Sequence, residues 1–139
     1  MSFTYHRTIH FKDTDAAGVV YFSNALSICH EAYEALLEML TIDLKEYFSG
    51  KSLAVPIVRA EIDFMQPMYC GDKIYIVLSG TIQFENTFTL KYEIYYNDSN
   101  NSDVNKPIAT ASTRHVAIDP VTRKRSKLPI EFLQWLSVQ

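Results

Sequence analysis

The sequence predicts an α+β fold in which an antiparallel β-sheet of about five strands wraps around one long central helix. Two observations support this fold class. Apolar residues recur at three- and four-residue steps from Ser23 to about Leu40, which is typical of a helix. The other apolar segments alternate with polar residues and follow one another directly, which favours antiparallel pairing. Because the helix is apolar around most of its circumference, we expect the sheet to cover it.

The first predicted strand occupies residues 3–12. Polar and apolar side chains alternate strictly there, which indicates a half-buried strand with an apolar face made of Phe3, Tyr5, Ile9 and Phe11. The next six residues, from Asp13 to Gly18, are rich in turn formers. The long helix follows, and we expect Ser23 or Asn24 to cap its start.

The rest of the chain continues the same pattern. A short second helix is expected at 43–49, with Asp43 as its N-cap. Alternating side chains predict four more strands, at about 58–64, 74–82, 88–96 and 108–118. Gly80 is expected to mark a bulge or bend in the second of these. Residues 97–106 are expected to form a loop, and Pro129 is expected to open a short C-terminal helix.

The composition indicates one globular domain over residues 1–139. Hydrophobic residues make up 47% of the chain and charged residues 21%, which excludes a disordered or fibrous protein. The formal net charge is −3 and the pI about 5.8, so we expect no nucleic-acid partner, which would require a basic face. Aromatic residues reach 13%, so some apolar surface is expected to meet a second subunit or to line a pocket.

The N-terminal sequence and the cysteines favour a cytoplasmic protein without a membrane partner. No apolar run has the length of a signal peptide, and none approaches the roughly 20 residues that span a bilayer. Cys29 and Cys70 are expected to be free, reduced thiols. The chain offers no closely spaced set of four zinc ligands, so we expect neither a metal nor a cofactor.

The segment from Asp13 to Phe22 carries the most suggestive chemistry. Two carboxylates precede Gly18 at a junction of strand and helix. The start of a helix presents unpaired N–H groups and partial positive charge, which can stabilise an oxyanion. A nearby carboxylate can attack a carbonyl or activate water. The pattern thus fits an acyl-transfer site, and it also fits an Asx-turn in which Asp13 and Asp15 only accept backbone hydrogen bonds.

The segment reads Asp13-x-Asp15-x-Ala17-Gly18-Val19-Val20-Tyr21-Phe22. It resembles the signature of the 4-hydroxybenzoyl-CoA thioesterase family, whose members have the hotdog fold. The resemblance continues in the same order through His30 to Glu34, Ile62 to Phe64, Pro67, Gly71-Asp72, Tyr92 to Ile94, His115-Val116 and Leu128-Pro129. Within this family, the segments Phe3 to Tyr5 and Cys29 to Glu34 are most similar to thioesterases that hydrolyse 1,4-dihydroxy-2-naphthoyl-CoA in phylloquinone biosynthesis.

The resemblance implies roles for particular residues. Asp15 corresponds to the family's catalytic carboxylate, either as nucleophile on the thioester or as general base on water. The backbone N–H of Phe22 corresponds to the oxyanion donor, and Asp13 is expected to hold the loop by hydrogen bonds. Residues expected near the acyl group are Gly18, Val19, Tyr21, Tyr33 and Phe64. His115 is expected to be a hydrogen-bonded structural histidine.

A basic turn stands out in this acidic chain. We use that name for Arg123, Lys124, Arg125 and Lys127. These side chains are expected to hold the phosphates of CoA, with Arg59 as a weaker candidate. The alternative is a solvated turn.

The resemblance also implies a homodimer with active sites at the subunit interface, assembled as a dimer of dimers. The expected substrate is an acyl-CoA whose acyl group is aromatic. Two alternatives remain: a short-chain aliphatic acyl-CoA or acyl-carrier-protein thioesterase of the Tol–Pal-associated type, and a non-catalytic acyl-CoA-binding protein. The presence of Asp15 argues against the second, because binding alone needs no such carboxylate.

Overall fold

The structure, a computed structural model, describes residues 1–97 and 106–138. Its strands are β1 (Ser2–Thr8), β2 (Ile57–Phe64), β3 (Lys73–Phe84), β4 (Thr87–Tyr96) and β5 (Ala109–Val116). They form one antiparallel sheet in the order β1-β3-β4-β5-β2. The helical segments are the 3₁₀ turn η1 (Phe11–Asp13) and the helices α1 (Phe22–Met39), α2 (Leu44–Tyr47) and α3 (Ile130–Ser137). The predicted α+β class and five-stranded sheet are confirmed.

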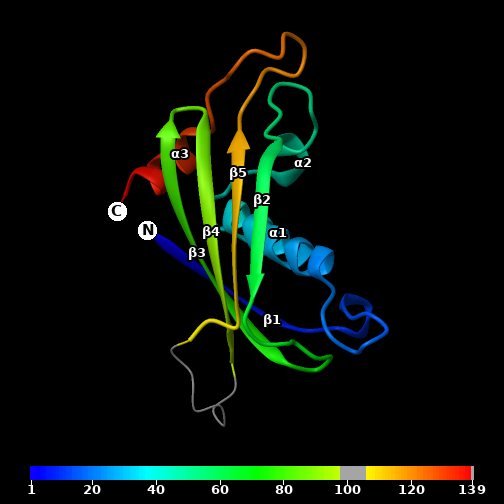
Figure 1. The fold of residues 1–139 in the computed structure, drawn as a ribbon. Coiled ribbons are helices and arrows are strands. Elements are labelled where there is room, and N and C mark those ends of the chain that lie inside the picture. Colours follow the sequence, from blue (N-terminus) through cyan, green and yellow to red (C-terminus); the bar gives the residue numbers. More distant parts are fainter. Residues whose placement is uncertain (98–105, 139) are drawn as a thin grey trace.

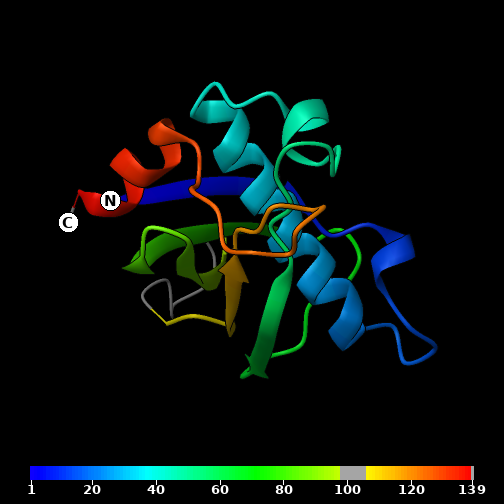
Figure 2. The same ribbon diagram turned by 90° about the horizontal axis from the view of Figure 1, so that it is seen from above.

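The core lies between α1 and the concave face of the sheet (Figures 1 and 2). The sheet curves around α1, as its wide apolar surface predicts. The buried residues of the helix are Ala25, Ile28, Cys29, Ala32, Tyr33, Leu36 and Leu37. They meet alternate side chains of the sheet, including Ile74, Ile76, Leu78, Phe88, Leu90 and Ile94. Strand periodicity of two and helical periodicity of 3.6 thus converge on one core.

The two edges of the sheet are β1 and β2. In β2 every side chain except Ile62 is exposed, although the sequence alternates apolar and polar residues there. The exposed apolar residues on and just after this strand are Ile57, Val58, Phe64 and Met65. An edge strand of this kind leaves backbone hydrogen-bonding groups unpaired on one side.

The first strand is shorter than its alternation predicts. It ends at Thr8, and Phe11 lies in η1 with 83% of its surface exposed. The chain turns here because the Asp13 carboxylate accepts the N–H of His10 at 2.7 Å. A local side-chain bond therefore competes successfully with continuation of the strand.

The predicted cap of the long helix is wrong in detail. The N-cap is Tyr21, whose own side chain makes no capping hydrogen bond. Asn24 instead donates its side-chain N–H to the carbonyl of Asp13 at 3.0 Å. By contrast, Asp43 caps α2 as predicted, because its carboxylate accepts the N–H of Lys45.

The bulge predicted at Gly80 is also wrong. Gly80 pairs regularly with Leu90, and the irregularity of this ladder lies between Ile82 and Phe84. The short C-terminal helix is confirmed as α3, with Pro129 at its N-cap. Most of the loop expected at 97–106 lies outside the described residues. Within the described ranges, no helix has the length and apolarity needed to cross a membrane.

Candidate active site

The loop between β1 and α1 is held in one conformation by its own hydrogen bonds. The backbone carbonyl of Asp15 accepts the N–H of Gly18 at 2.9 Å. The backbone N–H of Asp15 donates to the carbonyl of Val19 at 2.9 Å. Gly18 has a φ of +82°, in the left-handed region that glycine adopts without strain. Val20 then donates its N–H to the carbonyl of Met68 at 2.9 Å, which ties the loop to the segment after β2.

The geometry of Asp15 is compatible with both roles that the sequence left open. One carboxylate oxygen, Oδ1, accepts the N–H of Ala17 at 2.8 Å, which makes an Asx-turn. The side chain is nevertheless exposed and lines a cavity of about 350 Å³. Its second oxygen has no hydrogen-bond partner within residues 1–97 and 106–138 and remains available to a ligand.

The start of α1 forms another wall of this cavity. Tyr21 and Phe22 both line it. The N–H groups of Phe22 and the next two residues lie in the first turn and therefore have no acceptor within the helix. Since the Tyr21 side chain makes no capping hydrogen bond, the helix start and its partial positive charge lie at the wall of the cavity that Asp15 also lines.

Five residues singled out from the sequence meet in this cavity: Asp15, Val19, Tyr21, Phe22 and Phe64. Gly18 lies in the adjoining turn. The sequence reasoning missed Met65 and Gln66, which complete the wall opposite the helix. Their position directly after Phe64, which was predicted to lie near the acyl group, could have indicated that they also line the cavity. Most of the wall is apolar or aromatic, and a carboxylate and oriented N–H groups supply its polar side.

The sequence matches the thioesterase-like superfamily over residues 9–136. The chain belongs to this superfamily. A 1,4-dihydroxy-2-naphthoyl-CoA hydrolase from Crocosphaera subtropica is 52% identical over 133 residues, which cover 96% of this chain and 94% of that protein. Another from Nostoc punctiforme is 48% identical over 136 residues, covering 98% and 87%.

Solved structures support the same membership. The crystal structure of a 1,4-dihydroxy-2-naphthoyl-CoA thioesterase from Synechocystis superposes with a TM-score of 0.89 at 37% identity, covering 99% of this chain and 97% of that one. The hotdog thioesterase fold implied by the sequence is therefore confirmed.

Several residues that the sequence predicts to bind the substrate lie outside the Asp15 cavity. Tyr33 is buried in the core, where its hydroxyl is hydrogen-bonded to that of Tyr47. Burial, followed by the neighbouring Tyr47, raises the pKa of Tyr33 well above its ordinary value. Tyr33 therefore does not line the Asp15 cavity, and its ring lies against His115, which pairs with the first residue of β2.

The basic turn lies far along the sheet from Asp15 in the same chain. Arg123 lines a separate cavity beside Pro56, just before β2 begins, whereas the Asp15 cavity includes Phe64, where β2 ends. In Figure 1 the basic turn belongs to the orange loop at the top and the Asp15 loop is the blue segment at the lower right. Arg59 lies on β2, 3.2 Å from Glu61.

Hydrogen bonds shape the basic turn itself. The Asp119 carboxylate accepts the N–H groups of Thr122 and Val121, each at 2.9 Å, and these bonds lower the pKa of the carboxyl group. Arg123 adopts a φ of +63° at the tip. Arg125 reaches Asn86 and Lys127 lies 3.7 Å from Glu85. The basic side chains of the turn are exposed, which is compatible with the expected phosphate-binding role and with the alternative of a solvated turn.

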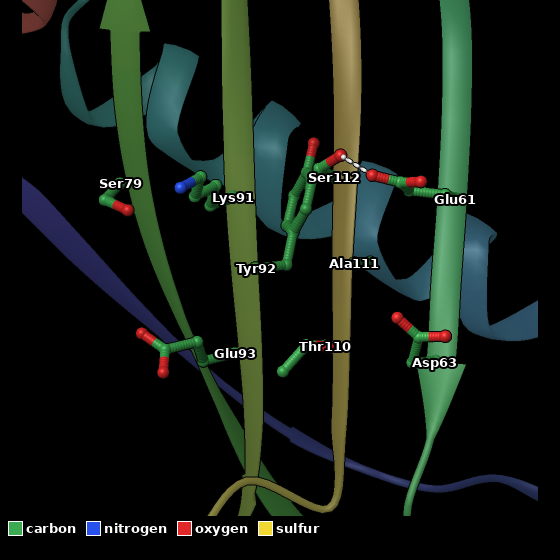
Figure 3. Close-up of a pocket in the computed structure, with 9 residues that line it drawn as sticks. All are labelled: Glu61, Asp63, Ser79, Lys91, Tyr92, Glu93, Thr110, Ala111 and Ser112. Atoms are coloured by element: carbon green, nitrogen blue, oxygen red, sulfur yellow. Dashed lines mark hydrogen bonds between the residues drawn. The ribbon is translucent and has the colours of Figure 1, made fainter.

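A larger cavity of about 450 Å³ lies on the face of the sheet turned away from α1 (Figure 3). Its charged side chains are Glu61, Asp63, Lys91 and Glu93. None of the residues predicted to be catalytic or substrate-binding lines this cavity, and no helix begins at its wall. It therefore lacks the groups that make the Asp15 cavity suited to acyl chemistry. Within the described ranges, no three His, Cys, Asp or Glu side chains gather as metal ligands.

Proposed function

We propose that this chain hydrolyses an aromatic acyl-CoA, 1,4-dihydroxy-2-naphthoyl-CoA, to 1,4-dihydroxy-2-naphthoate and CoA in phylloquinone biosynthesis. The observation that carries the proposal is the Asp15 carboxylate beside the uncapped start of α1, in a cavity with aromatic walls. The acyl group is inferred from relatives such as the Crocosphaera subtropica protein, a 1,4-dihydroxy-2-naphthoyl-CoA hydrolase.

The reaction follows from this arrangement. The thioester carbonyl oxygen accepts the N–H of Phe22, so that the negative charge developing on it is stabilised. Asp15 either attacks the carbonyl carbon or takes a proton from the water that does. The C–S bond then breaks and CoA leaves as a thiolate, which takes up a proton. On the nucleophilic route one water then hydrolyses the acyl–Asp15 anhydride, which releases the acid and restores the Asp15 carboxylate.

The walls of the cavity fit a flat aromatic acyl group. Phe64 and Tyr21 offer ring faces, and Met65 adds an adaptable apolar side chain. Gln66 is the one amide on the wall. Such a mixture favours a ring that carries hydroxyl groups over a short aliphatic chain.

Replacing Asp15 tests the proposal. Asp15→Asn should retain the fold and lose at least about 100-fold in kcat, because the amide neither attacks nor accepts a proton. Glu38→Gln, at an exposed carboxylate near the end of α1, is the control for the loss of a surface charge. Rates are measured on 1,4-dihydroxy-2-naphthoyl-CoA and on a short aliphatic acyl-CoA. An aliphatic preference, or near wild-type turnover by Asp15→Asn, would contradict the proposal.

We infer further that the chain works as a homodimer joined through β2. Two copies related by a two-fold axis present the same edge to each other, so their β2 strands run antiparallel. The basic turn lies at the start of β2 and Asp15 at its end. Antiparallel pairing therefore brings the basic turn of one copy to the Asp15 end of the other, where it can hold the CoA phosphates. The dimer of dimers remains a prediction.

Mixed dimers test this shared site. One chain carries Asp15→Asn and the other carries Arg123→Gln with Arg125→Gln. Each homodimer should be weakly active, whereas refolding the two together should restore one complete site in each mixed dimer. The control places all three substitutions in one chain and mixes it with wild type, which adds no new complete site. Failure of the first mixture to gain activity would contradict the shared site.

A further inference from the structure

The loop that carries Asp15 is anchored by a buried arginine on the neighbouring strand. Arg7 lies in β1 with only 7% of its side chain exposed. Its guanidinium donates to both oxygens of Asp13, at 2.6 and 3.2 Å, and to both oxygens of Glu31, at 2.6 and 3.2 Å. A further N–H reaches the carbonyl of Thr8 at 3.2 Å. One rigid fork therefore joins β1 to η1 and to α1.

Asp13 passes this anchoring on to the candidate active site. Its carboxylate accepts the N–H of His10 in addition to the two Arg7 bonds. Its carbonyl accepts the N–H of Tyr21 at 3.1 Å and the side-chain N–H of Asn24 at 3.0 Å. One residue thus ties together the beginning of the Asp15 loop and the beginning of α1.

The two groups of the proposed reaction lie close to these ties. Asp15 follows Asp13 by two residues, and Phe22 directly follows Tyr21. A shift of Asp13 would therefore move both the carboxylate and the oxyanion donor relative to the substrate. Rates respond steeply to displacements of about 1 Å in such sites.

The charges explain why an arginine stands at this position. Burial alone would raise the pKa of Asp13, but Arg7 and the His10 N–H outweigh it and hold that pKa below its ordinary value. Burial would likewise lower the pKa of Arg7, yet the bonds to Asp13 and Glu31 leave it raised. Asp13 and Arg7 thus stay ionised, and removing the guanidinium would leave the buried Asp13 carboxylate without its cationic partner.

We propose that Arg7 is a positioning residue of the active site, which acts through Asp13 and Glu31 to hold Asp15 and the Phe22 N–H in register with each other. It does not touch the substrate. The inference rests on the proposed function, because it assigns Arg7 a task in that reaction.

Arg7→Lys tests the inference, because lysine keeps the charge and loses the two-carboxylate fork. We expect kcat to fall up to roughly 100-fold while KM changes much less, since the altered loop weakens interactions made in the transition state. Hydrogen exchange should accelerate in residues 13–24 and remain unchanged in α3. That second readout does not depend on activity.

Leu136→Ala provides the matched control. Leu136 is a buried residue of α3, distant in the chain from the loop, and its truncation lowers stability through a cavity. At equal loss of Tm, only Arg7→Lys should reduce kcat. Equal kcat in the two variants, or exchange that rises evenly along the chain, would overturn the inference.

The same assays separate this inference from the proposed function. If wild type lacks thioesterase activity, the proposed function fails, and the exchange data alone decide whether Arg7 orders the loop. If wild type is active and Asp15→Asn is not, the proposed function stands and the kcat of Arg7→Lys decides the role of Arg7.

Discussion

At the residue scale, His115 shows how burial lowers the pKa of a histidine side chain. It is completely buried on β5. Its ring is stacked on that of Phe88, with 4.5 Å between the ring centroids, and its centroid lies 4.8 Å from that of Tyr33. Its Nε2 lies 2.7 Å from the Thr113 hydroxyl, but its Nδ1 has no partner among the described residues. The expectation of a hydrogen-bonded structural histidine therefore holds for one ring nitrogen only.

This environment predicts a pH-dependent stability. Burial, followed by the charge of nearby His30, lowers the pKa of His115 from 6.5 to about 3. Between these values the unfolded chain binds a proton that the folded chain does not, so stability falls as pH falls from about 6.5 toward 3. His115→Gln should reduce the loss in unfolding free energy between pH 7 and pH 5 by about 2 kcal/mol.

Urea denaturation at the two pH values measures this effect. His6→Gln, at an exposed histidine, controls for the loss of an imidazole as such. A pH dependence in His115→Gln equal to that of wild type would show that the buried ring is not its source.

At the element scale, Gly80 determines how closely α3 approaches the sheet. A Cβ at this position would lie 2.6 Å from Leu136, 3.0 Å from Trp135 and 3.3 Å from Leu90. The glycine therefore serves helix packing within a regular ladder, and not the bulge that the strand pattern predicts. The contact could not be read from the sequence, because the helix lies more than fifty residues further along the chain.

Gly80→Ala should destabilise the protein by about 1–3 kcal/mol through overpacking, although alanine is ordinarily the better strand residue. Thermal unfolding measures the change. Ser79→Ala, on the opposite face of the same strand, should have little effect. An unchanged Tm for Gly80→Ala would mean that Leu136 moves aside without cost.

At the scale of the whole molecule, the edge strand β2 exposes unpaired backbone groups and apolar side chains. Val58 is 58% exposed on this edge, and the apolar residues Ile57, Phe64 and Met65 are also exposed among the residues that the structure describes. Pairing with a second copy would satisfy the free backbone groups and also close the Asp15 cavity over Phe64 and Met65.

Val58→Lys should shift the protein from dimer toward monomer in light scattering, because a charge on an edge strand opposes pairing. Thioesterase activity should fall together with the dimer. Val138→Lys, at an exposed valine that follows α3, should leave both unchanged. A fully active monomer would contradict a site shared between subunits.

The sequence by itself determined the features that depend on short-range order. The period of apolar residues defined α1 and five strands, and the local pattern from Asp15 to Phe22 identified the turn and helix start that carry the candidate chemistry. Each of these depends on neighbours within a few residues, so each leaves a readable pattern.

Only the tertiary structure decided which distant residues share a surface. It brought Met65 and Gln66 opposite α1, left Tyr33 in the core, and placed the basic turn at the far end of β2. It also joined Arg7 to Glu31, 24 residues away. Packing between elements depends on the curvature of the sheet and the close fit of side chains, which no local periodicity encodes.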